Sequence, residues 1–133
     1  MSSRYAFESK NEYLVMRIAG RYDYWDFIQY PKIIRAACEE REVFRIMVDV
    51  VAVTYTELPT LELFFLGEKV AEVLRDRVKT ALIWHGDTRD GFMETVAVNR
   101  EAAIRIFDST ETAKIWLLYD HEDEPFNFQK PGS

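Results

Sequence analysis

His85 and the loop that follows it hold most of the side chains that could do acid–base chemistry. His85 ends a short apolar run, and Asp87, Arg89 and Asp90 come soon after it. An imidazole beside carboxylates can move protons near neutral pH, and α/β proteins place such groups at the carboxyl ends of parallel strands. No nucleophile stands at a spacing that would complete a catalytic set. We therefore expect a solvated loop and no enzyme, with catalysis at His85 as the alternative.

Other reactive groups are few. The chain has two histidines, and His121 lies in an acidic run near the C-terminus, so the sequence predicts no metal site. It also has no glycine-rich phosphate-binding loop, and we expect no cofactor. Cys38, the single cysteine, lies among Ile34 and Ala37 at helical spacing, which indicates a packing residue. Because one cysteine cannot form an internal disulfide, the chain fits a reducing cytoplasm.

The composition is that of an acidic globular domain. The 133 residues include 23 Asp and Glu against 17 Lys and Arg, which gives a net charge of -6. This balance argues against a general nucleic-acid binder, which needs clustered basic side chains to neutralise phosphates. There is no apolar signal segment, and no apolar run reaches the roughly 20 residues of a membrane span. We expect one cytoplasmic domain over residues 1–119 and a flexible polar tail over 120–133.

Strand-like and helix-like patterns alternate along the chain. Short β-branched or aromatic runs predict strands over residues 5–8, 13–19, 43–53, 80–84 and 103–107. Helical apolar spacing predicts helices over residues 23–40, 58–76, 92–99 and 108–119. Pro31 is expected to break the first of these helices. The order ββαβαβαβα predicts an α/β fold with a mixed, largely parallel sheet, an N-terminal antiparallel hairpin and helices on both faces.

Four short segments carry a resemblance to a known family. They are Lys79-Thr80-Ala81-Leu82-Ile83-Trp84, residues 92–100, Arg105-Ile106-Phe107 and Ala113-Lys114-Ile115-Trp116-Leu117. With the order of elements, they resemble the STAS/SEC14-like family, which includes the sporulation anti-sigma-factor antagonists, over residues 5–119. The resemblance implies a STAS-like fold and a regulatory or binding domain that is not an enzyme. The matching residues are packing residues, and none is a reacting group.

The chain departs from the antagonist pattern at its phosphorylated serine. Asp49 matches the acidic residue of the family's strand, and Glu57 falls where the family has the aspartate before its serine. Leu58 then stands in the place of the serine itself, so a kinase-controlled switch of that kind is not expected. Three hydroxyl side chains lie nearby but out of register: Thr54, Thr56 and Thr60. A possible loop site combines Thr54, Thr56, His85, Asp87 and Arg89.

The helix expected over residues 58–76 has more apolar surface than one core contact needs. Its core face carries Leu63, Leu66, Val70, Val73 and Leu74. The opposite side of its first two turns carries Leu58, Leu61, Phe64 and Phe65. In water these side chains would form a patch larger than most monomers expose. With Tyr55 they predict a homodimer or regulatory-partner surface, and the alternative is that the N-terminal hairpin or residues 22–25 cover them.

Aromatic side chains cluster between residues 22 and 30. The cluster includes Tyr22, Tyr24, Trp25 and Phe27. Aromatic rings can line a pocket for a small apolar ligand, with tyrosine hydroxyls as polar contacts. The SEC14 side of the resemblance implies a lipid or a similar molecule. The alternative, which we favour, is that these rings cap the sheet as ordinary packing.

Overall fold

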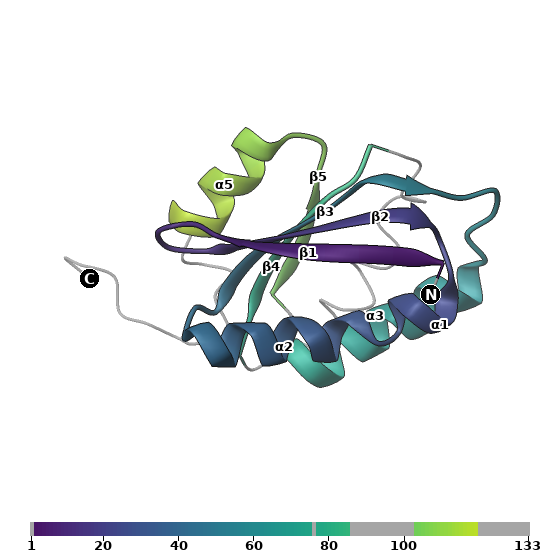
Figure 1. Ribbon diagram of the computed structural model, residues 1–133, viewed down its shortest axis with the longest axis horizontal. Coiled ribbons are helices and arrows are strands. Elements are labelled where there is room, and N and C mark those ends of the chain that lie inside the picture. The colour runs from purple at the N-terminus through teal and green to yellow at the C-terminus, as the bar shows by residue number, and fades with distance from the viewer. Residues whose placement is uncertain (1, 76, 86–102, 120–133) are drawn as a thin grey trace.

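The computed structural model describes residues 2–75, 77–85 and 103–119 (Figure 1). The helix expected over residues 92–99 and the tail expected from residue 120 lie outside these ranges. The other predicted strands and helices are present, with ends that differ from the predicted ones by a few residues. None of the helices in the described ranges is long and apolar enough to cross a membrane.

Five strands of the described residues form one sheet in the order β1-β2-β3-β4-β5. β1 (Ser3–Ser9) runs antiparallel to β2 (Leu14–Arg21), as a short hairpin requires. β3 (Arg45–Thr54), β4 (Lys79–Ile83) and β5 (Ile104–Phe107) follow, each parallel to its neighbour. The predicted mixed, largely parallel sheet with its N-terminal antiparallel hairpin is therefore confirmed.

Side chains that alternate along the strands build a core on each face of the sheet. On one face, Leu14 and Met16 of β2 pack with the helices α2 (Tyr30–Arg41) and α3 (Thr60–Leu74). On the other, Val15 packs with α5 (Thr110–Tyr119). Figure 1 shows α2 and α3 together below the sheet and α5 above it. This arrangement confirms the prediction of helices on both faces.

The chain breaks before Pro31 as expected. A single helical turn, α1 (Tyr24–Phe27), is capped by the Asp23 side chain, which accepts hydrogen bonds from the backbone N–H groups of Trp25 and Asp26. α2 then starts with Pro31 in its first turn, where a missing N–H leaves no helical hydrogen bond unmade. Two short pieces therefore replace the single helix that the apolar spacing alone predicts.

Asp26 joins α1 to the first residues of the chain. Its buried carboxylate accepts hydrogen bonds from the backbone N–H groups of Ser2 and Ser3, both at 3.0 Å, and from the Ser3 hydroxyl at 2.9 Å. The Ser3 hydroxyl also shares a hydrogen bond with Tyr30. Burial alone would raise the pKa of the Asp26 carboxyl, but the hydrogen bonds from Ser3 and Ser2 outweigh it and hold that pKa below its ordinary value. This contact fixes the aromatic segment against β1.

Replacing Asp26 with asparagine tests this contact. We expect D26N to lower the free energy of unfolding at neutral pH by about 1–3 kcal/mol, because buried donors lose a charged acceptor. The folded-state pKa of Asp26 lies below its unfolded value, about 3.9. The wild-type advantage is therefore present above that value and is lost as the pH falls through the folded pKa. Urea denaturation at several pH values measures it, and a difference that stays constant into the acid range would contradict the assignment.

Candidate functional site

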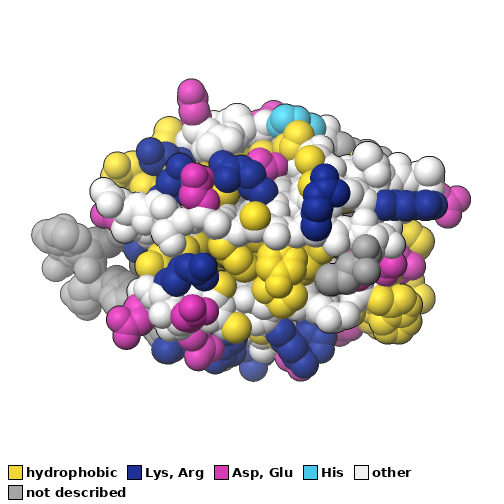
Figure 2. Space-filling view, viewed as in Figure 1, with side chains coloured by type: hydrophobic (Ala, Val, Ile, Leu, Met, Phe, Trp, Pro, Cys, Tyr) yellow, Lys and Arg dark blue, Asp and Glu magenta, His cyan; other side chains and the backbone are white. Residues whose placement is uncertain are grey.

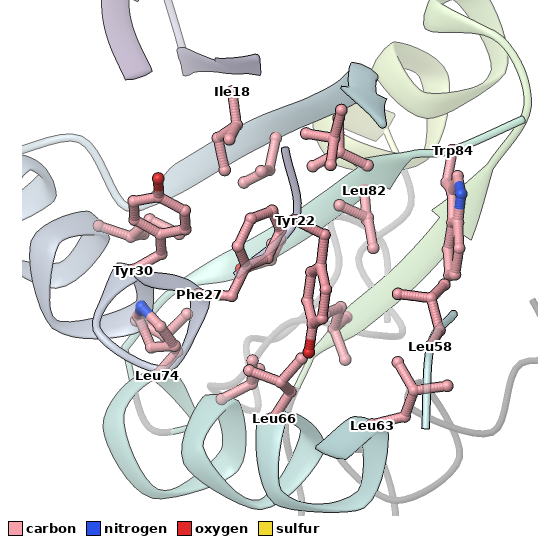
Figure 3. A pocket seen from close by; sticks show the side chains of 18 of the residues that line it. Ile18, Tyr22, Phe27, Tyr30, Leu58, Leu63, Leu66, Leu74, Leu82 and Trp84 are labelled. Carbon is pink, nitrogen blue, oxygen red and sulfur yellow. The ribbon is translucent and has the colours of Figure 1, made fainter. Parts of the chain in front are cut away.

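A largely apolar cavity lies between the sheet and the layer formed by α1, α2 and α3. Its volume is about 120 Å³. Figure 3 shows Ile18 and Leu82 reaching it from the strands, and Leu63 and Leu66 from α3. Phe27 closes the space from the side of α1. The cavity joins segments that are far apart in the sequence, and no single stretch of residues predicts it.

The structure divides the predicted aromatic cluster in two. Tyr22 and Phe27 line the cavity, and their ring centres lie 4.9 Å apart. Trp25 is instead 72% exposed. Tyr24 packs against the cluster of Leu58, Leu63 and Leu66, which line the cavity, but does not line the cavity itself. The prediction that Tyr24 and Trp25 line a pocket is therefore corrected. Successive helical residues point about 100° apart, so residues two positions apart point about 200° apart. Because Phe27 faces the cavity, Trp25 faces outward.

Tyr22 connects the segment before α1 to the first turn of α3. Its hydroxyl donates a hydrogen bond to Glu62 Oε1 at 2.8 Å. Burial and the adjacent Glu62 carboxylate raise the pKa of Tyr22 well above its ordinary value. The hydroxyl therefore stays protonated and remains a donor at neutral pH. Figure 3 shows this hydroxyl pointing towards α3, so its hydrogen-bonding capacity is directed to the helix.

The prediction that Leu58 belongs to the partner surface is wrong. It is only 7% exposed and lines the cavity, beside Trp84 in Figure 3. α3 begins at Thr60, and Pro59 before it has an extended backbone. The helical spacing that placed Leu58 on the outer face therefore does not extend to it. Tyr22 and Tyr24 pack on the cluster that contains Leu58, so residues 22–25 do cover this part of the apolar surface.

Leu61 and Phe65 remain uncovered on the outer face of α3. They are 64% and 41% exposed, respectively, and they stand one helical turn apart. Phe64 is half-buried, with its ring centre 5.7 Å from that of Phe65. Tyr55, in the loop before α3, is 39% exposed and packs edge-on against Trp84. The outer face of α3 thus keeps the central part of the predicted surface.

Asp49 has a structural role that its family position does not indicate. The pairing of β2 with β3 shifts between Arg17 and Ala19, so that β3 contains one extra residue there. Asp49 accepts a hydrogen bond from the backbone N–H of Val51 at 2.9 Å within this bulge. Its carboxylate therefore satisfies a backbone donor in the bulged stretch of the strand.

The possible loop site is placed only in part. Thr54 and Thr56 are exposed, and the Thr54 hydroxyl donates to the Gly20 carbonyl oxygen at 3.4 Å. His85 is exposed after β4, whereas Asp87 and Arg89 lie outside the described residues. Within the described ranges, no cluster of histidine, cysteine and carboxylate side chains could hold a metal ion.

β4 carries two buried polar side chains that the sequence patterns do not single out as site residues. Thr80 is 4% exposed and lines the cavity, and its Oγ1 has no hydrogen-bond partner among the described residues. Lys79 is 1% exposed on the opposite face of the sheet, where its Nζ donates to the Trp116 carbonyl oxygen at 2.8 Å. Both are polar side chains in an apolar strand, which is the only signal the sequence offers.

Cys38 is a core residue, as its spacing predicts. It is a fully buried residue of α2 and packs in the core between the sheet, α2 and α3. Burial raises the pKa of the Cys38 thiol to about 12, so the reactive thiolate form is scarce at neutral pH.

Comparisons with known proteins give fold likenesses only. No family model matches the chain, and no curated protein matches it. An anti-sigma factor antagonist from Mycobacterium paratuberculosis aligns with a TM-score of 0.59 and 14% identity, over 87% of this chain and 94% of that one. An uncharacterised DUF3478-family protein with a SpoIIAA-like fold from Shewanella loihica gives 0.53 and 16%, over 87% and 93%.

The anti-sigma factor antagonist SpoIIAA in its unphosphorylated form gives a TM-score of 0.51 and 16% identity, over 84% of this chain and 94% of that one. Identities this low are evidence about architecture, and all three alignments cover most of both chains. The chain therefore has the SpoIIAA-like α/β fold, the STAS-like architecture that its sequence motifs predict.

Proposed function

We propose that this chain is a non-catalytic STAS-like module that acts by binding another protein, and that a second copy of the chain is one such partner. The contact surface is the outer face of the first half of α3, with Leu61 and Phe65 at its centre and Tyr55 at its edge. The exposure of Leu61 and Phe65, on a helix whose other large apolar side chains are buried or half-buried, carries the proposal. Two of the structural neighbours are anti-sigma factor antagonists, which agrees with a role in protein contact.

Burial of this face would supply a substantial part of a binding free energy. Covering one leucine or phenylalanine side chain fully is worth about 1.5–3 kcal/mol. Leu61 and Phe65 are adjacent on one face, so a single partner surface can cover both. In a symmetric pair the same patch is used twice, and an apolar patch is complementary to itself. A second copy is therefore the simplest occupant.

The placement of the cysteine and of the described histidine supports a binding role. Cys38 is buried in the core, and His85 is exposed beyond the end of β4. These two side chains do not share a site. The cavity itself is lined mainly by apolar side chains, which suit binding better than bond making.

Charge substitutions on the outer face of α3 test the proposal. We expect the wild-type chain to dimerise, and L61E and F65E each to weaken the dimer by about tenfold or more, because a buried carboxylate would lack a partner. Sedimentation velocity over a concentration series measures the dissociation constant. I115E is the matched control: Ile115 is 60% exposed on α5, on the opposite side of the sheet.

Two further measurements show whether a weaker dimer reflects loss of the contact surface: the stability of each variant and the dimerisation of the control. At protein concentrations below the dimer dissociation constant, L61E and F65E should unfold at the wild-type urea concentration, since neither side chain belongs to the core. I115E should dimerise as the wild type does. A wild-type chain that stays monomeric at high concentration in light scattering would overturn the self-association.

The cavity favours a second candidate function, the binding of a small apolar ligand. Tyr22 and Phe27 from the aromatic cluster and Leu63 and Leu66 of α3 supply its walls. The volume is close to that of an engineered protein cavity of about 150 Å³ that binds benzene. A long acyl chain needs several times this space, so the ligand is expected to be smaller than a membrane lipid.

Native mass spectrometry of the freshly purified chain tests this second function. We expect a mass increment from a small molecule that denaturation releases. L61E should lose self-association and keep the increment, because Leu61 faces away from the cavity. Protein that carries no small molecule, and that binds no single-ring probe when one is added, would contradict ligand binding.

A further inference from the structure

We propose that Thr80 is the residue that selects the cavity's ligand, and that this ligand is a single-ring apolar molecule with one hydrogen-bonding group that pairs with the Thr80 hydroxyl. The inference rests on the second function proposed above, ligand binding in the cavity. It names the chemical class of the ligand and the side chain that recognises it.

The first step is the state of the hydroxyl groups around the cavity. Four tyrosine or threonine side chains of the described residues line it: Tyr22, Tyr30, Tyr55 and Thr80. Tyr55 is 39% exposed, so solvent can satisfy its hydroxyl. The Tyr22 hydroxyl donates to Glu62, and the Tyr30 hydroxyl is bonded to Ser3. Thr80 Oγ1 is the buried hydroxyl among them for which the described residues supply no partner. The Tyr22 and Tyr30 hydroxyls are therefore engaged by the protein, and the Thr80 hydroxyl is free for a ligand.

The second step is the position of Thr80 in its strand. Thr80 and Leu82 are two residues apart on β4, and both line the cavity. The flanking residue Ala81 packs on the opposite face with α5. The Thr80 side chain therefore faces the cavity by the alternation of the strand. Rotation between staggered χ1 positions exchanges Oγ1 with the methyl group, so the hydroxyl can meet a ligand without backbone movement.

The third step is what an unpaired hydroxyl does to the ligand-free protein. A buried polar group without a partner destabilises the folded state, and an apolar group of the same shape does not. Valine at position 80 would have the same shape and would suit a strand equally well. Folding alone therefore does not account for the hydroxyl at Thr80, whereas a ligand that supplies the missing hydrogen bond does.

Phenol and toluene form a matched pair of probes for this arrangement. They have nearly the same shape, and phenol carries a hydroxyl where toluene carries a methyl group. Titration of the ¹⁵N-labelled full chain, followed by NMR, gives a dissociation constant for each probe, and the shifted amides locate the binding. T80V removes the hydroxyl and keeps the shape. T56V is the control, because Thr56 is exposed and outside the cavity.

We expect T80V to shift the ratio of the phenol and toluene dissociation constants towards toluene by about fivefold, the effect of one lost hydrogen bond. T56V should leave the ratio at the wild-type value. In the absence of probe, T80V should melt a few degrees higher than the wild type, because it removes an unpaired buried hydroxyl.

The contrary outcomes separate this inference from the function on which it rests. If both probes bind and T80V changes both dissociation constants by the same factor, Thr80 does not recognise the ligand, but ligand binding stands. If neither probe binds, both are overturned. If T80V melts lower than the wild type, the hydroxyl has a partner within the protein, and the inference is wrong.

Discussion

The pairing of β3 is the constraint from which the rest of the structure follows. Over its first half, β3 is hydrogen-bonded to β2 on one side and to β4 on the other, and it is covered on both faces. After the bulge at Asp49, the described residues pair β3 only with β2. Val50 and Val53 beyond this point line the cavity. Part of the cavity wall therefore comes from the stretch where the central strand extends past its shorter neighbour. Val48, Thr80 and Leu82, in the half where β3 and β4 are paired, supply another part.

α3 separates the two surfaces to which functions are assigned. Leu63 and Leu66 on its inner face contribute to the cavity, and Leu61 and Phe65 on its outer face meet solvent. The helix is about 10 Å across, so the two surfaces are one helix apart. Figure 2 shows a different apolar region, a band of hydrophobic side chains between β1 and α2. Tyr5 of β1 packs edge-on against Tyr30 of α2. Tyr30 belongs to the core between the sheet and α2, so this ring contact is packing within the fold.

The sequence predicts the sheet and its helices well because each depends on a local pattern. Alternation over Leu14, Val15 and Met16 places each side chain on the correct face. The errors come where a helical pattern is extended past a helix end, as at Leu58, or across a single turn, as at Trp25. The existence and size of the cavity depend on the distances between β2, β4 and α3, and a local sequence pattern holds no information about these distances. Thr80 is not predicted as a site residue because hydropathy does not show whether a buried polar group has a hydrogen-bond partner.

The buried position of Leu58 changes the kind of signal that this part of the fold can receive. By the family resemblance, this is the place of a serine whose phosphate adds charge at the surface. Here the side chain has no hydroxyl and forms part of the cavity wall, next to Trp84 and the exposed loop that carries Tyr55. A kinase has nothing to modify at this position. Under the proposed ligand function, an input at this position would be steric, through the molecule that occupies the cavity, and not covalent.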